Sequence, residues 1–346
     1  MIPKPLLLSG SPGSPYTRKM VALLRYRRIA YRFTPSTNGI AGLPSAKPPL
    51  LPTFHLPGPT GEMEAVTDST PLIRRFEVDY SERSVIPPEP ALALFDALLE
   101  DFADEWLTKA MFHYRWHFKA DIDKAERILA CWWKREPMDD ASLAQLAKAV
   151  SGRQVPRLSF VGSNATTAPL IETGYLRVLL ALEEHLRHHS FLLGARPASA
   201  DFAIYGQLTQ LVQFDPTSMA LAVEHAPRVC AWVGMLEDLS GIDVPEEDGW
   251  LDARTLPPSL LALMHEVGRL YVPVILANAQ AVSHGNTSFE TTVDGQPWAQ
   301  NTFAYQAKCL AWLRRDYQAL DVVARALVDQ VLADSGCAAL FHPVAV

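Results

Sequence analysis

Hydroxyl groups and a proline gather at the start of a predicted helix near the N-terminus. The stretch reads SGSPGSPYTRKM, from Ser9 to Met20, and apolar residues follow it. Pro15 suits the first turn of a helix, where a missing N–H costs nothing. A helix N-terminus favours negative charge because its N–H groups are unpaired and its dipole is positive there. The stretch therefore predicts a helix start that can hold an anion beside Ser14 or, alternatively, Ser11.

A second predicted helix start carries an acidic residue next to a hydroxyl. In DSTPLIRRFEV, Asp68 or Ser69 is placed to cap the helix, and Pro71 lies in its first turn. Two short strand candidates, PTFHL and EMEAV, precede it, and the turn-forming run PGPTG separates them. The pair can hold a ligand at a helix N-terminus or act only as a cap.

A stripe of polar and aromatic side chains follows one predicted helix. Lys109, His113 and His117 share a face by i,i+4 spacing, and Tyr114 and Phe118 lie on a neighbouring face. Such a stripe can line a pocket for an apolar or aromatic ligand, or it can belong to the core and a dimer interface. The two histidines have metal-ligand spacing, but the sequence shows no HExxH and no third ligand, so we expect no metal.

Composition excludes several classes of protein. The chain has 346 residues, 49% of them hydrophobic, and a net charge of −7 without a long basic block. This balance indicates globular domains with a core and disfavours nucleic-acid binding. The N-terminus lacks the apolar region of a secretory signal, and no uninterrupted apolar run reaches the roughly 18 residues of a membrane span. We expect no membrane partner and a cytoplasmic location.

The cysteines are few and far apart. Cys131, Cys230, Cys309 and Cys337 show no CxxC spacing and are expected to be buried free thiols of a reducing compartment. The first of them comes long after the helix start at Ser14, so mixed-disulfide chemistry is excluded at that helix. Arg18 and Lys19, within that helix, are expected to be surface charges.

Three parts follow one another along the chain. Residues 1–83 predict the order β-α-β, irregular chain, then β-β-α, and residues 84–242 predict an all-α region. A polar, proline-rich linker leads into residues 243–346, a mostly helical extension. Its hairpin near 288–299 is signalled by Asp294-Gly295, and helices are expected around 302–317 and 319–334.

This arrangement resembles the glutathione transferase superfamily, which has a thioredoxin-like domain with a mixed four-stranded sheet before an all-α domain. SPYTRK, from Ser14 to Lys19, is similar to the Ser/Cys-Pro-aromatic helix start of the serine and cysteine classes. LLPTF puts Pro52 where the family has a cis proline, and Asp68-Ser69 matches the acidic-Ser pair after strand four. In the all-α part, GARPASAD resembles the family's buried capping motif. It departs at Ala198, where a hydroxyl is expected, so either the N-cap shifts to Ser199 or the motif reduces to Asp201 reaching back to the Ala198 N–H.

The resemblance implies that glutathione is the co-substrate. It assigns the thiolate-supporting hydroxyl to Ser14, with Ser11 as the alternative, and the backbone contact to the cysteinyl part to Leu51, beside Pro52. Asp68 and Ser69 would bind the γ-glutamyl end. Lys47 is the nearest cation for the glycyl carboxylate. The stripe of Lys109, His113, Tyr114 and His117 would be the substrate wall.

The resemblance also implies an activity and an assembly. We expect a homodimer that conjugates the glutathione thiolate to a small apolar or aromatic electrophile, without a metal. The alternative is a non-catalytic glutathione- or ligand-binding protein, or an interaction protein, of the same fold. Residues 243–346 have no counterpart in the usual family layout.

Overall fold

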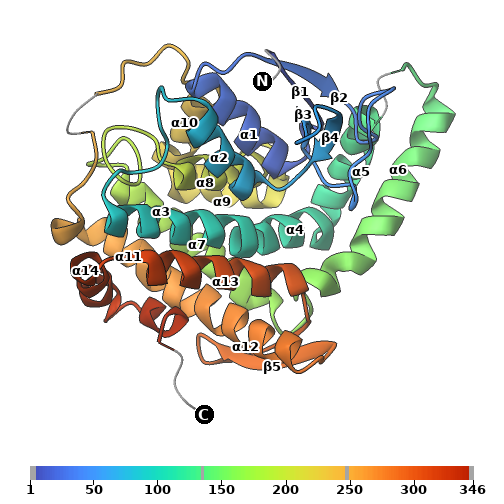
Figure 1. The fold of residues 1–346 in the computed structure, drawn as a ribbon. Helices are drawn as coiled ribbons and strands as arrows, with labels where there is room; N and C mark the ends of the chain where they lie inside the picture. The colour runs from blue at the N-terminus through green and yellow to red at the C-terminus, as the bar shows by residue number, and fades with distance from the viewer. Residues whose placement is uncertain (1–4, 134–135, 246–248, 343–346) are drawn as a thin grey trace.

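The N-terminal part of the chain is a mixed four-stranded sheet with two helices (Figure 1). The computed structural model describes residues 5–133, 136–245 and 249–342. The strands lie in the order β2-β1-β3-β4; β1 runs parallel to β2 and antiparallel to β3, and β3 runs antiparallel to β4. The elements are β1 (Leu6–Gly10), α1 (Pro15–Tyr26), β2 (Tyr31–Pro35), β3 (Thr53–Pro57), β4 (Met63–Val66) and α2 (Ser69–Asp79). The predicted order is confirmed, including the irregular chain between β2 and β3.

Local sequence explains why these elements form. The side chains of Leu6, Leu8 and Phe54 from β1 and β3 are fully buried, as the apolar runs predict. Helix α1 begins with Pro15 in its first turn, and the Ser14 hydroxyl accepts a hydrogen bond from the Thr17 N–H at 3.2 Å. Ser14 is therefore a true N-cap, which stabilises a helix by about 1 kcal/mol.

The all-α part surrounds one buried helix. Its helices are α3 (Pro90–Phe102), η1 (Ala103–Leu107), α4 (Thr108–His117), α5 (Lys119–Trp133), α6 (Asp140–Gln154), η2 (Val155–Val161), α7 (Ala168–His185), α8 (Ser199–Leu211), α9 (Pro216–His225) and α10 (Pro227–Leu236). Helix α8 is buried along its whole length and packs on both α1 and α3. The core that positions the first domain is thus shared with the second.

Of the two forms expected for the capping motif before α8, the structure shows the reduced one, with Ala198 at the N-cap. Asp201 accepts hydrogen bonds from the backbone N–H groups of Ala198 at 2.8 Å and of Leu192 at 2.9 Å. The Ser199 hydroxyl does not replace the missing cap, because it donates to the carboxylates of Asp96 and Glu100.

The helical stretch from α3 to α4 contains a π-helical turn. Residues Ala103–Leu107 form a π-helical turn, η1, between α3 and α4. The backbone carbonyl of Asp104 in this turn accepts a hydrogen bond from the Tyr16 hydroxyl at 2.7 Å. A π turn widens the helix locally and is often found at functional sites.

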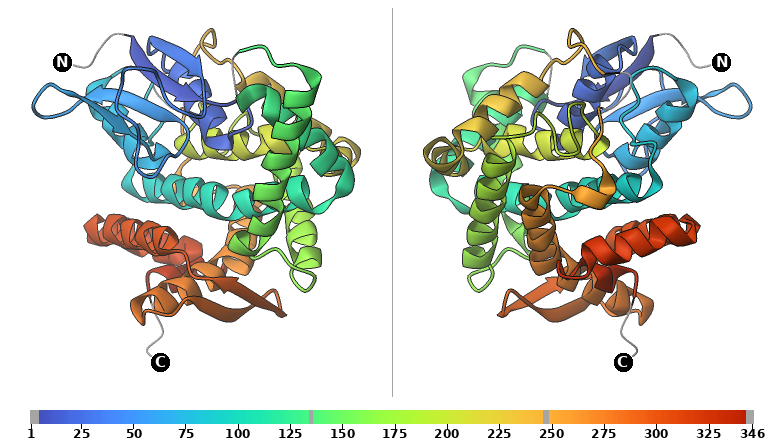
Figure 2. Two further views of the ribbon diagram at one scale, coloured as in Figure 1. Left: turned by 90° about the vertical axis from the view of Figure 1, so that its right-hand side faces the viewer. Right: turned by 90° about the vertical axis from the view of Figure 1, so that its left-hand side faces the viewer.

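The C-terminal extension packs against the far side of α3 and α4, away from the sheet (Figures 1 and 2). Its elements are η3 (Ala253–Thr255), α11 (Pro258–Glu266), η4 (Val267–Tyr271), α12 (Val272–Ser283), β5 (Ser288–Val293), β6 (Gln296–Asn301), α13 (Ala304–Ala319), α14 (Val322–Leu332) and η5 (Cys337–Leu340). The hairpin prediction is confirmed: Asp294 and Gly295 both have positive φ at the turn between β5 and β6. Helices α13 and α14 both contact α3.

The structure bears on the expectation of no membrane span and on that of buried cysteines. The continuous helical stretch Pro258–Ser283 is long and apolar enough to cross a membrane by length and composition, and 56% of its most apolar window is buried inside the fold. Among the cysteines, all free, Cys309 and Cys337 are buried as expected. Cys230 is half-buried and Cys131 is exposed, so the expectation is wrong for Cys131.

Candidate functional site

Three of the predicted site segments converge at one edge of the sheet. Ser9 at the end of β1 pairs with Thr53 at the start of β3. One residue further along β3, Phe54 pairs with Val66 at the end of β4. The loop to α1, the segment before β3 and the link to α2 therefore leave the sheet at the same edge. The N-termini of α1 and α2 both belong to this edge, which favours a negatively charged ligand.

The two serines at the start of α1 differ in their surroundings. The Ser11 side chain is buried, and its hydroxyl oxygen accepts a weak hydrogen bond from the Gly13 N–H at 3.4 Å. Ser14 is half-buried and uses its oxygen to cap the helix. A serine hydroxyl carries one donor and two acceptor sites, so the capping bond leaves the Ser14 proton free to donate.

Two buried side chains from the all-α part hold the loop that carries Ser14. Arg115 donates to the Gly13 carbonyl at 3.0 Å and to both carboxylate oxygens of Asp215. Gln210 donates to the Pro12 carbonyl at 3.2 Å and accepts from Arg115. These bonds fix the backbone immediately before Ser14, and the sequence alone does not reveal them because the partners lie about 100 to 200 residues apart.

The segment before β3 has the predicted backbone. The Leu51–Pro52 peptide is cis, and Pro52 is buried while Leu51 is half-buried. Lys47 lies in the irregular chain before it and is exposed. The contacts predicted for Leu51 and Lys47 with glutathione stay predictions.

Asp68 sits at the N-terminus of α2 in an unusual backbone conformation, with φ +83°. Its carboxylate does not cap the helix and instead accepts a hydrogen bond from the Tyr305 hydroxyl of α13 at 2.8 Å. Burial raises the pKa of Asp68, and the Tyr305 hydrogen bond opposes this rise. A residue of the extension thus occupies the carboxylate that was predicted to bind the γ-glutamyl ammonium.

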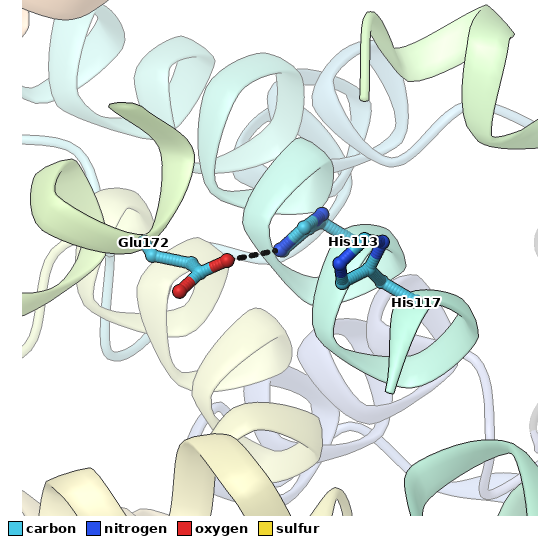
Figure 3. Close-up of side chains that lie close together, drawn as sticks. All are labelled: His113, His117 and Glu172. Atoms are coloured by element: carbon cyan, nitrogen blue, oxygen red, sulfur yellow. Dashed lines mark hydrogen bonds and ion pairs between the residues drawn. The ribbon is translucent and has the colours of Figure 1, made fainter. Parts of the chain in front are cut away.

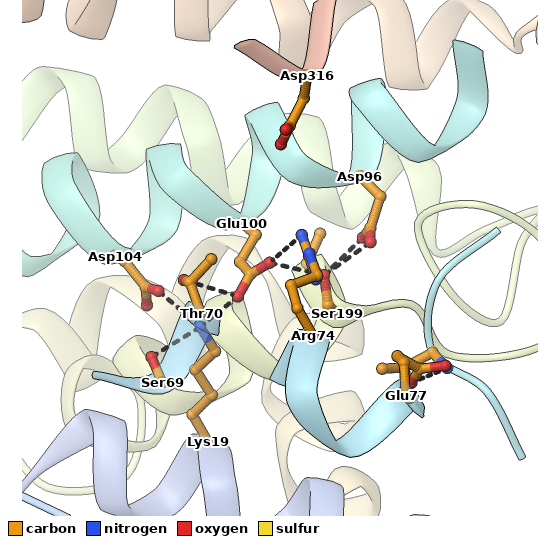
Figure 4. A network of polar contacts seen from close by, with 12 residues as sticks. Lys19, Ser69, Thr70, Arg74, Glu77, Asp96, Glu100, Asp104, Ser199 and Asp316 are labelled. Atoms are coloured by element: carbon orange, nitrogen blue, oxygen red, sulfur yellow. Dashed lines mark hydrogen bonds and ion pairs between the residues drawn. The ribbon is translucent and has the colours of Figure 1, made fainter. Parts of the chain in front are cut away.

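Lys19 is fully buried, so the expectation of a surface charge is wrong (Figure 4). Its ammonium donates to Asp104 at 2.6 Å, to Glu100 at 2.8 Å and to the Ser69 hydroxyl at 3.1 Å. The physical reason is that α3 and η1 present two carboxylates toward α1. The i,i+4 spacing of the acids Glu100 and Asp104 was the available signal in the sequence.

The network continues through Glu100. This carboxylate also accepts hydrogen bonds from Thr70, Arg74 and Ser199 (Figure 4). Burial opposes its ionisation, but Lys19 and Arg74 outweigh burial and hold the pKa of Glu100 well below its usual range. For Lys19, burial lowers the pKa, while Asp104 and Glu100 raise it more, so the ammonium stays charged.

Three residues of the predicted substrate wall on α4, Lys109, His113 and Tyr114, are enclosed by protein, whereas His117 is exposed. Lys109 is buried, donates to Gln300 of β6 at 2.9 Å and lies 6.0 Å from the Trp298 ring. Burial lowers its pKa to about 8, although Glu105 opposes the shift. Tyr114 is also buried, and its ring packs against those of Phe118 and Tyr175. Contact of these side chains with a substrate stays a prediction that their burial does not favour.

The histidines of the same helix meet a carboxylate from α7 (Figure 3). His113 and His117 stack with ring centroids 4.6 Å apart, and His113 lies 3.2 Å from a carboxylate oxygen of Glu172. The sequence-based statement that no third ligand accompanies the two histidines is therefore wrong. Glu172 lies more than 50 residues away along the chain, and only the packing of α7 on α4 brings it close.

Comparison with known families assigns the chain to a superfamily. The family model described as the glutathione S-transferase N-terminal domain matches residues 8–84, and that of the glutathione S-transferase C-terminal domain matches residues 158–239. The chain belongs to the glutathione S-transferase superfamily. The matched ranges include Ser14, Pro52, Asp68 and Ser69, whereas α11 to α14 of the extension lie outside them. No curated protein matches the chain.

Solved structures of this superfamily resemble the chain at low identity. A glutathione S-transferase from Methylobacterium radiotolerans, in complex with glutathione sulfonate, is 17% identical with a TM-score of 0.39, over 67% of this chain and 90% of that one. A member from Pseudomonas fluorescens with two glutathione bound is 14% identical with a TM-score of 0.41, over 66% and 87%. A transferase from Pseudomonas putida with glutathione disulfide bound is 14% identical with a TM-score of 0.40, over 67% and 86%.

Proposed function

We propose that this member of the superfamily is a glutathione-dependent transferase, which conjugates the glutathione thiolate to a small apolar or aromatic electrophile. The observation that carries the proposal is the Ser14 hydroxyl. It lies at the N-terminus of α1 with its proton free to donate, at the sheet edge where cis-Pro52 and the Asp68-Ser69 pair also lie. Family membership supports glutathione as the co-substrate.

The proposed role of Ser14 follows from thiol chemistry. A thiol such as that of cysteine has a pKa of about 8.5, so most of it is protonated and unreactive at neutral pH. The α1 N-terminus and a hydrogen bond donated by Ser14 both stabilise the thiolate and so lower this pKa. The thiol proton passes to solvent, and the thiolate forms a bond to the electrophilic carbon. In a displacement the leaving group departs with its electron pair; in an addition to an electron-poor double bond the resulting carbanion takes a proton from solvent. Holding both reactants together supplies the remaining acceleration.

The proposed binding of the tripeptide uses the other residues of this edge. The Leu51 backbone beside Pro52 pairs with the cysteinyl part, and Lys47, which is exposed, approaches the glycyl carboxylate. Ser69, whose hydroxyl oxygen accepts a hydrogen bond from Lys19, receives the γ-glutamyl carboxylate at the α2 N-terminus. The γ-glutamyl ammonium competes with the Tyr305 hydroxyl for Asp68.

The ultraviolet absorbance of the thiolate tests this proposal. Adding glutathione to the protein at pH 7 is expected to raise this absorbance, and Ser14→Ala is expected to abolish the rise. Ser11→Ala is the matched control and is expected to keep it. The transferase proposal fails if the wild type binds no glutathione or forms no thiolate. If Ser11→Ala abolishes the rise and Ser14→Ala does not, the role passes to Ser11.

A second function has one observation in its favour. The Tyr305 hydroxyl already satisfies the Asp68 carboxylate, and Lys19 already bonds to Ser69, so protein groups engage both γ-glutamyl contacts. This supports a non-catalytic ligand-binding or interaction protein of the same fold. Glutathione binding measured by calorimetry without any thiolate absorbance would favour this function over transfer.

We also propose a cytoplasmic homodimer that acts on small molecules and uses no metal for transfer. Sedimentation of the full chain tests the assembly, with a mass of twice 38.3 kDa expected. The reduced state of the cysteines supports the location, since disulfides are rare in the cytosol.

A further inference from the structure

Two imidazoles and one carboxylate converge at the C-terminal end of α4. The side chains are those of His113, His117 and Glu172, and one ligand atom from each lies within 4.8 Å of the others (Figure 3). Figure 3 shows His113 and His117 one turn apart on α4, with Glu172 facing them from α7. Within the residues that the structure describes, it is the one such group of three histidine, cysteine or acidic side chains.

This set of atoms has the chemistry of a transition-metal site. Two histidines and one glutamate are a known ligand set for Zn²⁺, with a fourth position left open for water. At bond lengths of about 2.0–2.2 Å, tetrahedral ligand atoms lie roughly 3.3 Å apart, so the three atoms must approach by about 1.5 Å at most. The His117 side chain is exposed and that of Glu172 is 37% exposed, so both have room to make this adjustment and an ion can reach them.

The second nitrogen of His113 has the partner that a metal-binding histidine needs. Its Nδ1 lies 2.8 Å from the Ser163 hydroxyl, which can donate or accept. When Nδ1–H donates to Ser163, the lone pair of Nε2 points toward Glu172 and is free to bind a cation. A hydrogen bond of this kind fixes the orientation and tautomer of a ligating imidazole.

The charge of Glu172 is also available. Among the described residues its partner is the imidazole of His113, and neither lysine nor arginine pairs with it there. A divalent cation would neutralise this carboxylate.

A second histidine pair in the same fold lacks these features. His185 and His189 at the end of α7 also stack, with ring centroids 4.7 Å apart. However, the two nitrogens of His185 are taken by the Ser259 hydroxyl and the Phe191 carbonyl. Stacked histidines alone therefore do not make the site; the converging carboxylate distinguishes the pair on α4.

We propose that His113, His117 and Glu172 bind one divalent transition-metal ion of the Zn²⁺ class. The ion would join α4 to α7 and would complete its coordination with water. The proposal is independent of glutathione transfer, because none of the three residues belongs to the edge of the sheet that carries Ser14.

The test uses the full-length chain without a histidine tag, freed of metal by dialysis against a chelator. Co²⁺ is added as a spectroscopic probe, and Zn²⁺ is then titrated against it. We expect one ion per chain and a visible Co²⁺ absorption band that Zn²⁺ removes. Ser163 would contact a ligand and not the ion, and loss of such a residue typically weakens metal binding roughly 10- to 100-fold. We expect Ser163→Ala to weaken binding by about tenfold. We expect His117→Ala or Glu172→Gln, which each remove a ligand, to weaken it by more than this range.

His189→Ala is the matched control, since it removes one histidine of a stacked pair without touching the site. It is expected to bind Zn²⁺ as the wild type does. His117 is exposed, so its replacement leaves the core intact, and circular dichroism verifies the fold of each variant. The proposal is overturned if the wild type binds no stoichiometric Co²⁺ or Zn²⁺. It is equally overturned if His117→Ala retains wild-type affinity, or if His189→Ala loses as much affinity as His117→Ala.

Discussion

Removing the Tyr305 hydroxyl deletes the hydrogen bond by which the extension engages Asp68 of the predicted γ-glutamyl site. Tyr305→Phe keeps the ring and its packing near Phe303 and Trp312, and deletes the 2.8 Å hydrogen bond to Asp68. If glutathione binds as proposed, its γ-glutamyl ammonium must displace this hydroxyl. The variant should therefore bind glutathione more tightly than the wild type.

The magnitude follows from the charge of the acceptor. A hydrogen bond to a charged group contributes about 1.5–3 kcal/mol. Since each 1.4 kcal/mol corresponds to a factor of ten in affinity, the variant should bind glutathione about 10- to 100-fold more tightly. Asp68 is half-buried, so water replaces the lost hydrogen bond only in part. The 100-fold end of the range requires that the γ-glutamyl ammonium replaces the whole lost interaction.

Isothermal titration with glutathione at pH 7 measures the effect. Tyr317→Phe is the matched control, because it also deletes a tyrosine hydroxyl of α13 that donates to an aspartate, Asp329, at 2.8 Å. Its affinity for glutathione should equal that of the wild type. Equal affinities of wild type and Tyr305→Phe would refute the assignment of Asp68 to the γ-glutamyl ammonium, provided that both bind.

Three further outcomes are expected. Lys19→Met leaves two buried carboxylates without their shared cation, so the free energy of unfolding in urea should fall by about 3–5 kcal/mol; a loss below 1 kcal/mol would contradict the described network. Arg115→Lys removes the fork that holds the Gly13 carbonyl, so the thiolate absorbance with glutathione should fall even at saturation; an unchanged absorbance at saturation would show that Ser14 is placed without Arg115. Burial lowers the pKa of His185 to about 4 in the folded state, whereas an unperturbed histidine has a pKa of about 6.5. As the pH falls, the unfolded state therefore binds this proton before the folded state does. The stability from the neutral, buried His185 is complete above about pH 6.5 and is lost as the pH falls toward 4. Urea unfolding at pH 7 and at pH 5 should show a loss of about 2 kcal/mol in the free energy of unfolding from this group. The His185→Gln variant should lack this loss. The control variant His188→Gln, at an exposed residue, should keep it.

Local patterns predicted much of the fold correctly. The helix start at Ser14-Pro15, the Asp294-Gly295 turn and the reduced cap at Asp201 all depend on residues a few positions apart. Hydrogen bonds and backbone conformations within a few residues determine such features, so they can be predicted from the local sequence. The π-helical turn at Ala103–Leu107 was missed because it has no comparable local signature.

The site itself was predicted only in part. The sequence determined which residues lie at the two helix N-termini, because capping serines and acids and early prolines mark these positions. It misplaced Lys19, whose burial depends on acids about 80 residues away. It also gave no sign of Arg115 holding the Gly13 carbonyl.

The sequence by itself determined the family, the order of the elements and the Ser14 helix start, because each of these depends on motifs of neighbouring residues. Only the tertiary structure decided that Tyr305 bonds to Asp68 and that Glu172 joins His113 and His117. Both contacts join elements far apart in the chain. Their formation depends on how the apolar faces of α3, α4, α7 and α13 pack, and local residue patterns do not specify that packing.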